Sequence, residues 1–217
     1  MISNKEIAEN IASILLDIKA IKLSPKNPFT WASGLRSPIY CDNRIALSFP
    51  DKRAYIKEKI VTTIKEYFTE VEVIAGVATA GIPQGALVAD MLGLPFVYVR
   101  SSAKSHGMTN KIEGNIEKGQ RVVVIEDLVS TGKSSLDAVD ALRAVNADVM
   151  GMVAIFTYGL DIAVDNFASK GCDLIALSDY NAMISKAVSE KYVSFEDEKS
   201  LLEWRTNPKN WSDSITD

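Results

Sequence analysis

The stretch most able to do chemistry is VVVIEDLVSTGKSS, residues 122–135. Its first apolar residues predict a buried strand, which Glu126 and Asp127 close before a short polar loop leads into a helix. Backbone N–H groups at a helix N-terminus are unpaired and carry partial positive charge, so residues 130–134 could hold a phosphate monoester. Gly132 permits a positive φ and a close approach to that ligand. The two carboxylates could accept hydrogen bonds from vicinal hydroxyls such as those of a ribose.

Two simpler interpretations of this stretch compete with a sugar-phosphate site. The letters GKSS suggest a nucleotide-binding P-loop, but that motif needs a glycine five residues before Gly132, where the sequence has Asp127. A strand, a helix cap and a solvated acidic pair would account for Glu126 and Asp127 without any ligand. That interpretation leaves the order of the whole stretch unexplained, so we favour a ligand site.

A second candidate is the polar stretch VRSSAKSHGMTNKIEG, residues 99–114, whose composition predicts a long exposed loop without regular structure. Arg100, Lys104 and His106 bring positive charge to this loop. Such charge suits a pyrophosphate leaving group, because the charge that develops on it must be neutralised, and a closing loop would exclude water. The alternative is a solvated basic loop that takes no part in chemistry.

The two candidate loops must be held in place by the regular elements around them, and the sequence here alternates apolar runs with helical stretches. The runs are continuously apolar, which predicts strands covered on both faces in a parallel sheet. In such sheets ligands bind outside the carboxyl ends of the strands, where both candidate loops begin. We expect strands at 71–78, 95–100, 121–127, 150–158 and 173–178, and helices near 82–92, 133–145 and 161–170.

The N-terminal part of the chain predicts a helix and a small cap. Ile7, Ile11 and Ile14 share one helical face, and packing on the core is favoured over a membrane surface because the polar face is acidic as well as basic. In residues 24–44, FTW and PIYC predict short strands around a turn. A helix is expected over 51–67, with its first residue as the N-cap.

The C-terminal part predicts one or two helices over 180–205, and the last dozen residues read as a loop. The whole chain is then a single doubly wound α/β domain. Its expected parts are an N-terminal cap at roughly 1–48, a core at roughly 49–180 and C-terminal helices at roughly 180–205.

Composition bounds the class of protein. The 217 residues are 47% hydrophobic and 24% charged, which is typical of a soluble globular domain. Lys+Arg 24 against Asp+Glu 28 gives a net charge of −4, so the basic surplus of a nucleic-acid-binding protein is missing. Cys41 and Cys172 are too few for a disulfide scaffold or a four-cysteine zinc site. We expect free thiols in the cytoplasm, with no targeting segment and no membrane span.

Residues 122–135 resemble the signature with which type I phosphoribosyltransferases bind 5-phosphoribosyl 1-pyrophosphate (PRPP). The shared order is an apolar strand, two acids, two residues, Ser/Thr-x-Gly and a helix. The resemblance implies a parallel sheet flanked by helices, a small N-terminal cap that is called the hood in this family, and PRPP with Mg²⁺ as a substrate. It also implies that Glu126 and Asp127 hold the ribose hydroxyls and that residues 130–134 hold the 5-phosphate.

Two more segments resemble the orotate phosphoribosyltransferases within that family. Their hood motif, F-T-x-x-S-G-x-x-S-P, is matched by FTWASGLRSPIYCDNR at 29–44, and their pyrophosphate-contacting first core loop by GVATAGIP at 76–83. Their catalytic loop is matched at Arg100, Ala103, Lys104, His106 and Gly107. The resemblance implies transfer of phosphoribose from PRPP to orotate in pyrimidine biosynthesis, by a homodimer in which each loop reaches into the neighbouring subunit's site.

The resemblance assigns roles to three groups of residues. Neutralisation of the leaving pyrophosphate is implied for Arg100, Lys104 and His106. Contacts with PRPP are implied for Arg100, Lys104, His106, Glu126, Asp127, Leu128, Val129, Ser130, Thr131, Gly132, Lys133 and Ser134. Contacts with orotate are implied for Tyr40, Cys41 and Ser130. Mg²⁺ would be held mainly through PRPP, without a metal site of the protein's own.

The sequence departs from the family pattern at several basic positions, and it leaves other functions open. Many orotate enzymes carry basic residues at the positions of Ala32, Ala80 and Ser101, and near Tyr158. The missing charge near orotate's carboxylate could be supplied by Arg36, Arg44 or Lys133.

Three alternative functions stay open. A purine phosphoribosyltransferase would share the PRPP signature but has no reason to carry the hood motif, and a PRPP-binding regulatory protein could lose the catalytic loop. The third alternative is a flavodoxin-like sheet that binds another phosphate ligand.

Overall fold

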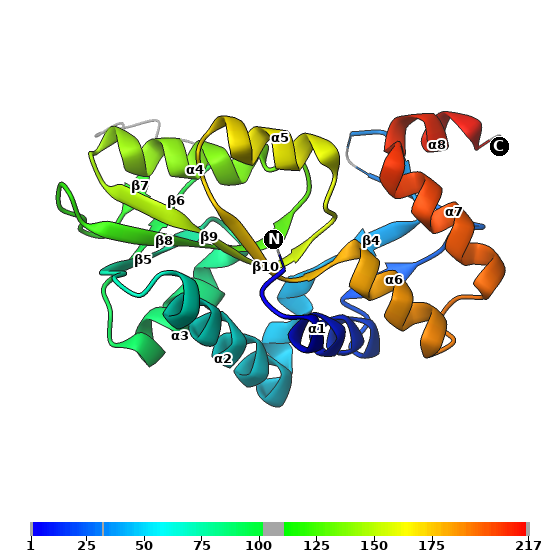
Figure 1. The fold of residues 1–217 in the computed structure, drawn as a ribbon, viewed down its shortest axis with the longest axis horizontal. Helices are drawn as coiled ribbons and strands as arrows, with labels where there is room; N and C mark the ends of the chain where they lie inside the picture. Colours follow the sequence, from blue (N-terminus) through cyan, green and yellow to red (C-terminus); the bar gives the residue numbers. More distant parts are fainter. Residues whose placement is uncertain (1, 32, 102–110, 216–217) are drawn as a thin grey trace.

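Figure 1 shows a computed structural model of the chain, which describes residues 2–31, 33–101 and 111–215. These residues form a central six-stranded sheet with the order β10-β9-β8-β5-β6-β7. Neighbouring strands are parallel except at the β7 edge, where the pairing is antiparallel, so the predicted parallel sheet is confirmed. The strands are β5 (Val73–Val77), β6 (Phe96–Val99), β7 (Ile112–Glu113), β8 (Arg121–Val129), β9 (Asp148–Thr157) and β10 (Leu174–Asp179).

The sheet corrects two expectations about where strands end. The segment 99–114 is not wholly irregular, because its last residues pair with β6 as the short strand β7. Strand β8 runs two residues past its expected end, since Leu128 and Val129 pair with Phe156 and Thr157 of β9. The acidic pair therefore lies within the ladder, where backbone pairing on the β9 side restricts its position.

Helices cover both faces of the sheet, which is why its strands are apolar throughout. In β8, Val123 and Ile125 belong to one core cluster and Val122 and Val124 to the other, because successive side chains of a strand point to opposite faces. Figure 1 shows α1, α2 and α3 on one face and α4 and α5 on the other. Their bounds are α1 (Lys5–Asp17), α2 (Pro50–Tyr67), α3 (Gly81–Leu92), α4 (Lys133–Ala144) and α5 (Asp161–Ser169).

The predicted helices are confirmed, with one correction at the start of α2. The N-cap is Phe49, and Asp51, the expected cap, already lies in the first turn. Pro50 explains the shift, because its fixed φ and missing N–H suit the first helical position. Helix α1 packs against β10 and α6 with Ile11 buried, which confirms core packing for its apolar face. None of the helices within the described ranges is long and apolar enough to cross a membrane.

The hood contains two small antiparallel sheets instead of the single turn that was expected. Strand β2 (Phe29–Thr30) pairs with β3 (Arg36–Ser37), and β1 (Ile21–Leu23) pairs with β4 (Ile39–Cys41). Short strands form within FTW and PIYC as expected, but they do not flank one turn, because each pairs with a different strand. The tight turn at Gly34, whose φ is +84°, brings Thr30 back onto Arg36, and Pro38 separates β3 from β4. The helical turn η1 (Asn43–Ser48) then leads from the hood into α2.

The C-terminal part of the chain is helical as far as Ser214 and completes the hood. Helices α6 (Tyr180–Ser189) and α7 (Phe195–Thr206) confirm the prediction for 180–205. The last dozen residues are not a loop, because α8 spans Pro208–Ser214, with Pro208 in the first turn and the Asn207 side chain accepting from Asn210 N. Helix α8 lies against β3, where Arg36 N donates to Ser212 Oγ at 2.9 Å. The C-terminal helix α8 therefore lies beside the small strands of the hood, at the end of the molecule away from β7 (Figure 1).

Candidate active site

The candidate site begins at the carboxyl end of β8, where the two acids lie side by side in the chain. Glu126 is 5% exposed. Its Oε2 accepts from Ser135 Oγ at 2.8 Å and its Oε1 from the backbone N–H of Asp127 at 3.0 Å. Burial and the neighbouring Asp127 raise the pKa of Glu126 to about 8, and burial also raises the pKa of Asp127. Hydroxyl donors that favour the charged forms would relieve this cost, as the hydroxyls of a bound ribose would.

The loop from β8 to α4 has the features expected of a phosphate-binding turn. Gly132 caps α4 with φ +78°, and no side chain caps the first amides of the helix. A Cβ at this position would lie 2.6 Å from Phe167 Cε2, so only glycine fits. Helix α5 also supports the loop through Asn166, whose Nδ2 donates to Thr131 O at 2.9 Å. The structure thus leaves amide donors and hydroxyls at residues 130–134 together at one helix N-terminus.

The turn after β5 closes the site from the other side. A Cβ at Gly81 would lie 2.5 Å from Ile125 O, and one at Gly76 would lie 2.8 Å from Gly81 O. The segment GVATAGIP therefore packs its backbone directly onto the end of β8, next to Glu126. The peptide between Ala78 and Thr79 is cis, and Ala80 precedes α3.

Hood residues reach the acid pair through one buried amide. Asn43 Nδ2 donates to Asp127 O at 2.6 Å, and Cys41 Sγ donates to Asn43 Oδ1 at 3.3 Å. Burial, followed by the charges of Asp127 and Asp42, raises the pKa of the Cys41 thiol well above its ordinary value, so the thiol stays neutral. The structure thus brings Cys41 beside Asp127, while Tyr40 next to it is 42% exposed. Asn43 escaped sequence reasoning because nothing local marks an asparagine that will be buried by a distant strand.

The predicted cationic loop is described only at its ends. Arg100 follows β6, where its N donates to Lys111 O at 2.8 Å and its Nη1 pairs with Glu113 Oε1 at 3.4 Å. Lys104 and His106 lie outside the described residues, as does Ala32 of the hood motif. Arg100 and the start of the loop thus stand at the carboxyl end of β6, beside the strand that leads to GVATAGIP.

Comparisons with known proteins agree with this geometry. Residues 50–191 match the model of the phosphoribosyl transferase domain. An orotate phosphoribosyltransferase of Listeria monocytogenes is 54% identical over 205 residues, which cover 94% of this chain and 98% of that protein. One from Porphyromonas gingivalis is 53% identical over 207 residues, covering 95% and 99%.

Solved structures are similar as well. The orotate phosphoribosyltransferase of Aeropyrum pernix superposes with a TM-score of 0.74 at 26% identity, covering 85% of this chain and 99% of that one. The UMP synthase of Leishmania donovani, at 24% identity and a TM-score of 0.76, shares the fold over 91% of this chain and 42% of its own. The chain therefore belongs to the phosphoribosyltransferase domain family. Within that family it belongs to the orotate phosphoribosyltransferases.

Proposed function

We propose that this chain transfers the phosphoribosyl group of PRPP to orotate, giving orotidine 5′-monophosphate (OMP) and pyrophosphate. Membership in the orotate phosphoribosyltransferases supports the reaction. The structural observation that carries it is the buried Glu126–Asp127 pair beside the uncapped N-terminus of α4. Carboxylates suit ribose hydroxyls and the helix amides suit a phosphate, so the two halves of a phosphoribose have adjacent partners.

In this proposal, different residues of the site bind the ribose and phosphate of PRPP and the orotate base. Glu126 and Asp127 bind the ribose hydroxyls, and the chain from Leu128 and Val129 through residues 130–134 carries the phosphate-binding amides and hydroxyls. Backbone groups of Tyr40 and Cys41 pair with the ring edge of orotate, and Ser130 contacts its carboxylate. The base is thereby held on the hood side of Asp127, to which Asn43 ties the hood.

The reaction then exchanges one bond at ribose C1 for another. The ring nitrogen N1 of orotate forms the new bond as the C1–O bond to pyrophosphate breaks, and the electron pair leaves with pyrophosphate. Because the ring nitrogen of orotate loses its proton readily, no strong general base is required. Arg100, Lys104 and His106 stabilise the charge that develops on the leaving group. Lys104 has the central part, since a flexible ammonium follows a departing polyanion.

Mg²⁺ would arrive with PRPP, and the carboxyls of Glu126 and Asp127 at the proposed ribose site are chemically suited to it. Among the described residues, no group of three or more His, Cys, Asp or Glu side chains is placed to hold a metal ion. Glu126 and Asp127 would offer oxygen ligands of the kind that Mg²⁺ prefers, with PRPP supplying the remainder. When bound, the ion neutralises charge on the pyrophosphate.

Three further proposals concern the working form of the protein. It acts as a homodimer in which the 99–114 loop of one subunit serves the site of the other. Each subunit works as one domain, with the hood at roughly 1–48, the core at roughly 49–180 and the C-terminal helices after it. We place it in the cytoplasm, where its two free cysteines would stay reduced.

Turnover with a panel of bases tests the function. Purified protein is mixed with PRPP, Mg²⁺ and orotate, and the loss of orotate's ultraviolet absorbance is followed. Adenine, hypoxanthine, guanine and uracil are assayed in parallel by product chromatography. We expect turnover of orotate alone. Turnover of a purine would assign a purine phosphoribosyltransferase, and PRPP binding by calorimetry without turnover of any base would assign a regulatory protein.

A further inference from the structure

A cavity of about 630 Å³ opens beside the phosphate loop, on its hood side. One wall is the loop itself, at Ser130 and Thr131, and Trp31 of the hood forms another. The third wall is the corner between α7 and α8, which brings Arg205 to the cavity. Most of its lining is apolar, so an anionic group that entered would need a cation there.

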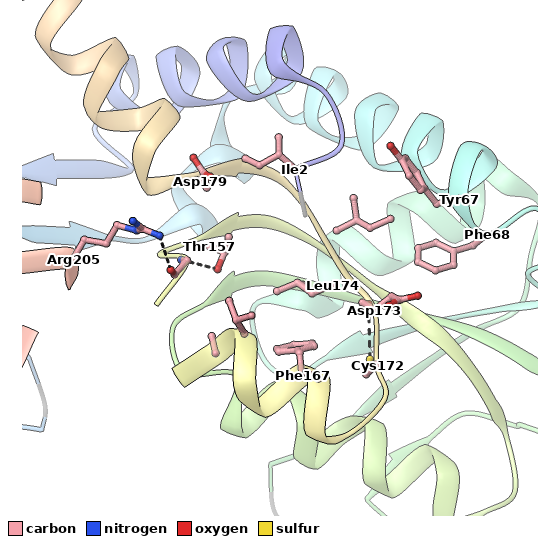
Figure 2. A pocket seen from close by; sticks show the side chains of 15 residues that line it. Ile2, Tyr67, Phe68, Thr157, Phe167, Cys172, Asp173, Leu174, Asp179 and Arg205 are labelled. Carbon is pink, nitrogen blue, oxygen red and sulfur yellow. Dashed lines mark hydrogen bonds between the residues drawn. The ribbon is translucent and has the colours of Figure 1, made fainter. Parts of the chain in front are cut away.

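Arg205 is held in place by the buried residue before it. Trp204 packs edge-on against Tyr158 and Trp31, at centroid distances of 5.6 and 5.7 Å, and is fully buried. This aromatic cluster anchors α7 against the loop after β9. Figure 2 shows a second cavity that Arg205 also lines, and in it the Arg205 side chain reaches toward the loop that follows Thr157.

The guanidinium of Arg205 uses only part of its hydrogen-bonding capacity within the described residues. Its Nη2 donates to Gly159 O at 3.0 Å. Within the described ranges it has no carboxylate partner, and the side chain is half-buried. A guanidinium carries five N–H donors, so most of them remain for a ligand that enters the cavity. Asp161 lines the same cavity but is exposed.

The other arginines and the lysine considered near the site are engaged or turned away. Arg36 Nη1 donates to Ile215 O at 3.3 Å within the hood. Arg44 is held by Asp42 through two bonds of 2.7 and 2.8 Å. Lys133 lines a different cavity, on the outer side of α4 with Asp137. Lys209 lines the same cavity but is exposed, so the half-buried Arg205 is the cation best placed to meet an anion that also reaches Ser130.

We propose that Arg205 binds the carboxylate of orotate, and thereby sets the preference for orotate over a base without that group. The inference rests on the proposed function. Orotate is uracil with a carboxylate on C6, so the enzyme must place one extra negative charge on the hood side of the ribose. Arg205 from one wall and the Ser130 hydroxyl from the other can donate to that carboxylate together, and charge-assisted bonds of this kind are strong. The selectivity therefore comes from the C-terminal helices.

Binding of two nucleotides that differ only in the carboxylate tests this without turnover. We would measure the Kd of OMP and of uridine 5′-monophosphate (UMP) by calorimetry on the full chain and on Arg205→Gln and Arg205→Lys. Loss of a hydrogen bond to a charged group costs roughly tenfold or more in affinity. We expect Arg205→Gln to lose about that much of the preference for OMP over UMP, Arg205→Lys to keep part of it, and PRPP to bind all forms equally.

Arg143→Gln is the matched control. Arg143 also donates to backbone carbonyls, Lys170 O at 2.6 Å and Gly171 O at 2.9 Å, but it does not line the cavity. It should keep the full preference for OMP.

Four outcomes would overturn the inference. If Arg205→Gln melts at a lower temperature yet keeps the preference, the residue merely supports the loop at Gly159. If it loses as much affinity for PRPP as for OMP, it binds the phosphate instead. If the wild type binds OMP and UMP equally, no carboxylate site exists, and the base panel shows separately whether the proposed reaction fails as well. Should Arg205→Gln fail to fold, Arg205→Lys with the full wild-type preference would contradict a role that depends on the guanidinium.

Discussion

At the scale of single residues, the site depends on the protonation state of one buried carboxyl group, that of Glu126. Glu126 is almost wholly buried beside a second acid, and both circumstances favour its protonated form. Ser135 opposes them with a 2.8 Å bond that favours the charged form. The chain thus keeps an acid that is costly to ionise at the position where ribose hydroxyls are proposed to bind.

The first prediction concerns stability against pH. The pKa of Glu126 rises from 4.5 to about 8 on folding, so between these values the folded state keeps a proton that the unfolded chain releases. The free energy of unfolding should therefore fall as the pH rises through this window. Glu126→Gln has no such proton, and its stability should fall less from pH 5 to 8. Denaturant unfolding of both proteins across this range measures the difference.

Glu72→Gln serves as its control. Glu72 is exposed, and its hydrogen bonds with Arg121 lower its pKa, so it is ionised in both states throughout the window. Its variant should keep the wild-type slope. The prediction is wrong if Glu126→Gln loses stability with pH as steeply as the wild type does.

At the scale of elements, the loop between β8 and α4 has its shape because α5 supports it. Gly132 adopts a left-handed conformation directly under Phe167, and Asn166 holds the carbonyl of Thr131. These contacts join the loop between β8 and α4 to the neighbouring helix α5. A substitution in the loop should therefore change both the affinity for PRPP and the free energy of unfolding.

The second prediction uses this contact. Gly132→Ala combines left-handed strain, which costs roughly 1–2 kcal/mol, with a clash against Phe167, whose Cε2 would lie 2.6 Å from the new Cβ. We expect a larger loss of unfolding free energy than strain alone gives, together with weaker PRPP binding. Denaturant unfolding and calorimetry measure the two effects.

Gly171→Ala separates strain from the clash. Gly171 also has a positive φ, +53°, but no atom lies within 4 Å of a Cβ built there. That variant should show the strain alone and normal PRPP affinity. Equal losses of stability in both variants would show that Phe167 gives way without cost.

At the scale of the whole molecule, the hood is built from both ends of the chain over the carboxyl ends of the strands. The N-terminal strands meet α8 at Arg36 and Ser212, and Asn43 ties this assembly to Asp127. The proposed loop from a second subunit would cover the remaining side. The complete site is therefore expected only in a dimer.

The third prediction is complementation between two inactive variants. Lys104→Ala should lower kcat by several orders of magnitude without unfolding the protein, and Asp127→Asn should be inactive at a PRPP concentration near the wild-type KM because it binds PRPP weakly. After subunits are mixed and exchanged, half of the dimers are hybrids with one intact site each, so about a quarter of the activity should return. Steady-state turnover after mixing measures it. A mixture of Lys104→Ala with His106→Ala, both on the same loop, should stay inactive, and no recovery in the first mixture would mean that the loop serves its own subunit.

Much of the architecture, and the family to which the chain belongs, could be predicted from the sequence alone. The continuous apolar runs predicted a parallel sheet because both faces of such strands are buried, and the order of residues 122–135 predicted the strand, the loop and the helix that follow one another there. These features are local, since a strand, two acids and a glycine before a helix carry their meaning within one short stretch. The composition likewise excludes a disulfide scaffold, because the chain has only two cysteines.

The contacts between residues far apart in the chain were decided by the tertiary structure alone. No local pattern indicates that Asn43 reaches Asp127, that Phe167 closes over Gly132, or that Arg205 stands across a cavity from Ser130. The same holds for the hood, where the pairing partners depended on a turn at Gly34 and on a C-terminal helix that packs over β3. Such contacts depend on how separate elements pack, and packing energy is shared among many weak contacts that no single stretch of sequence contains.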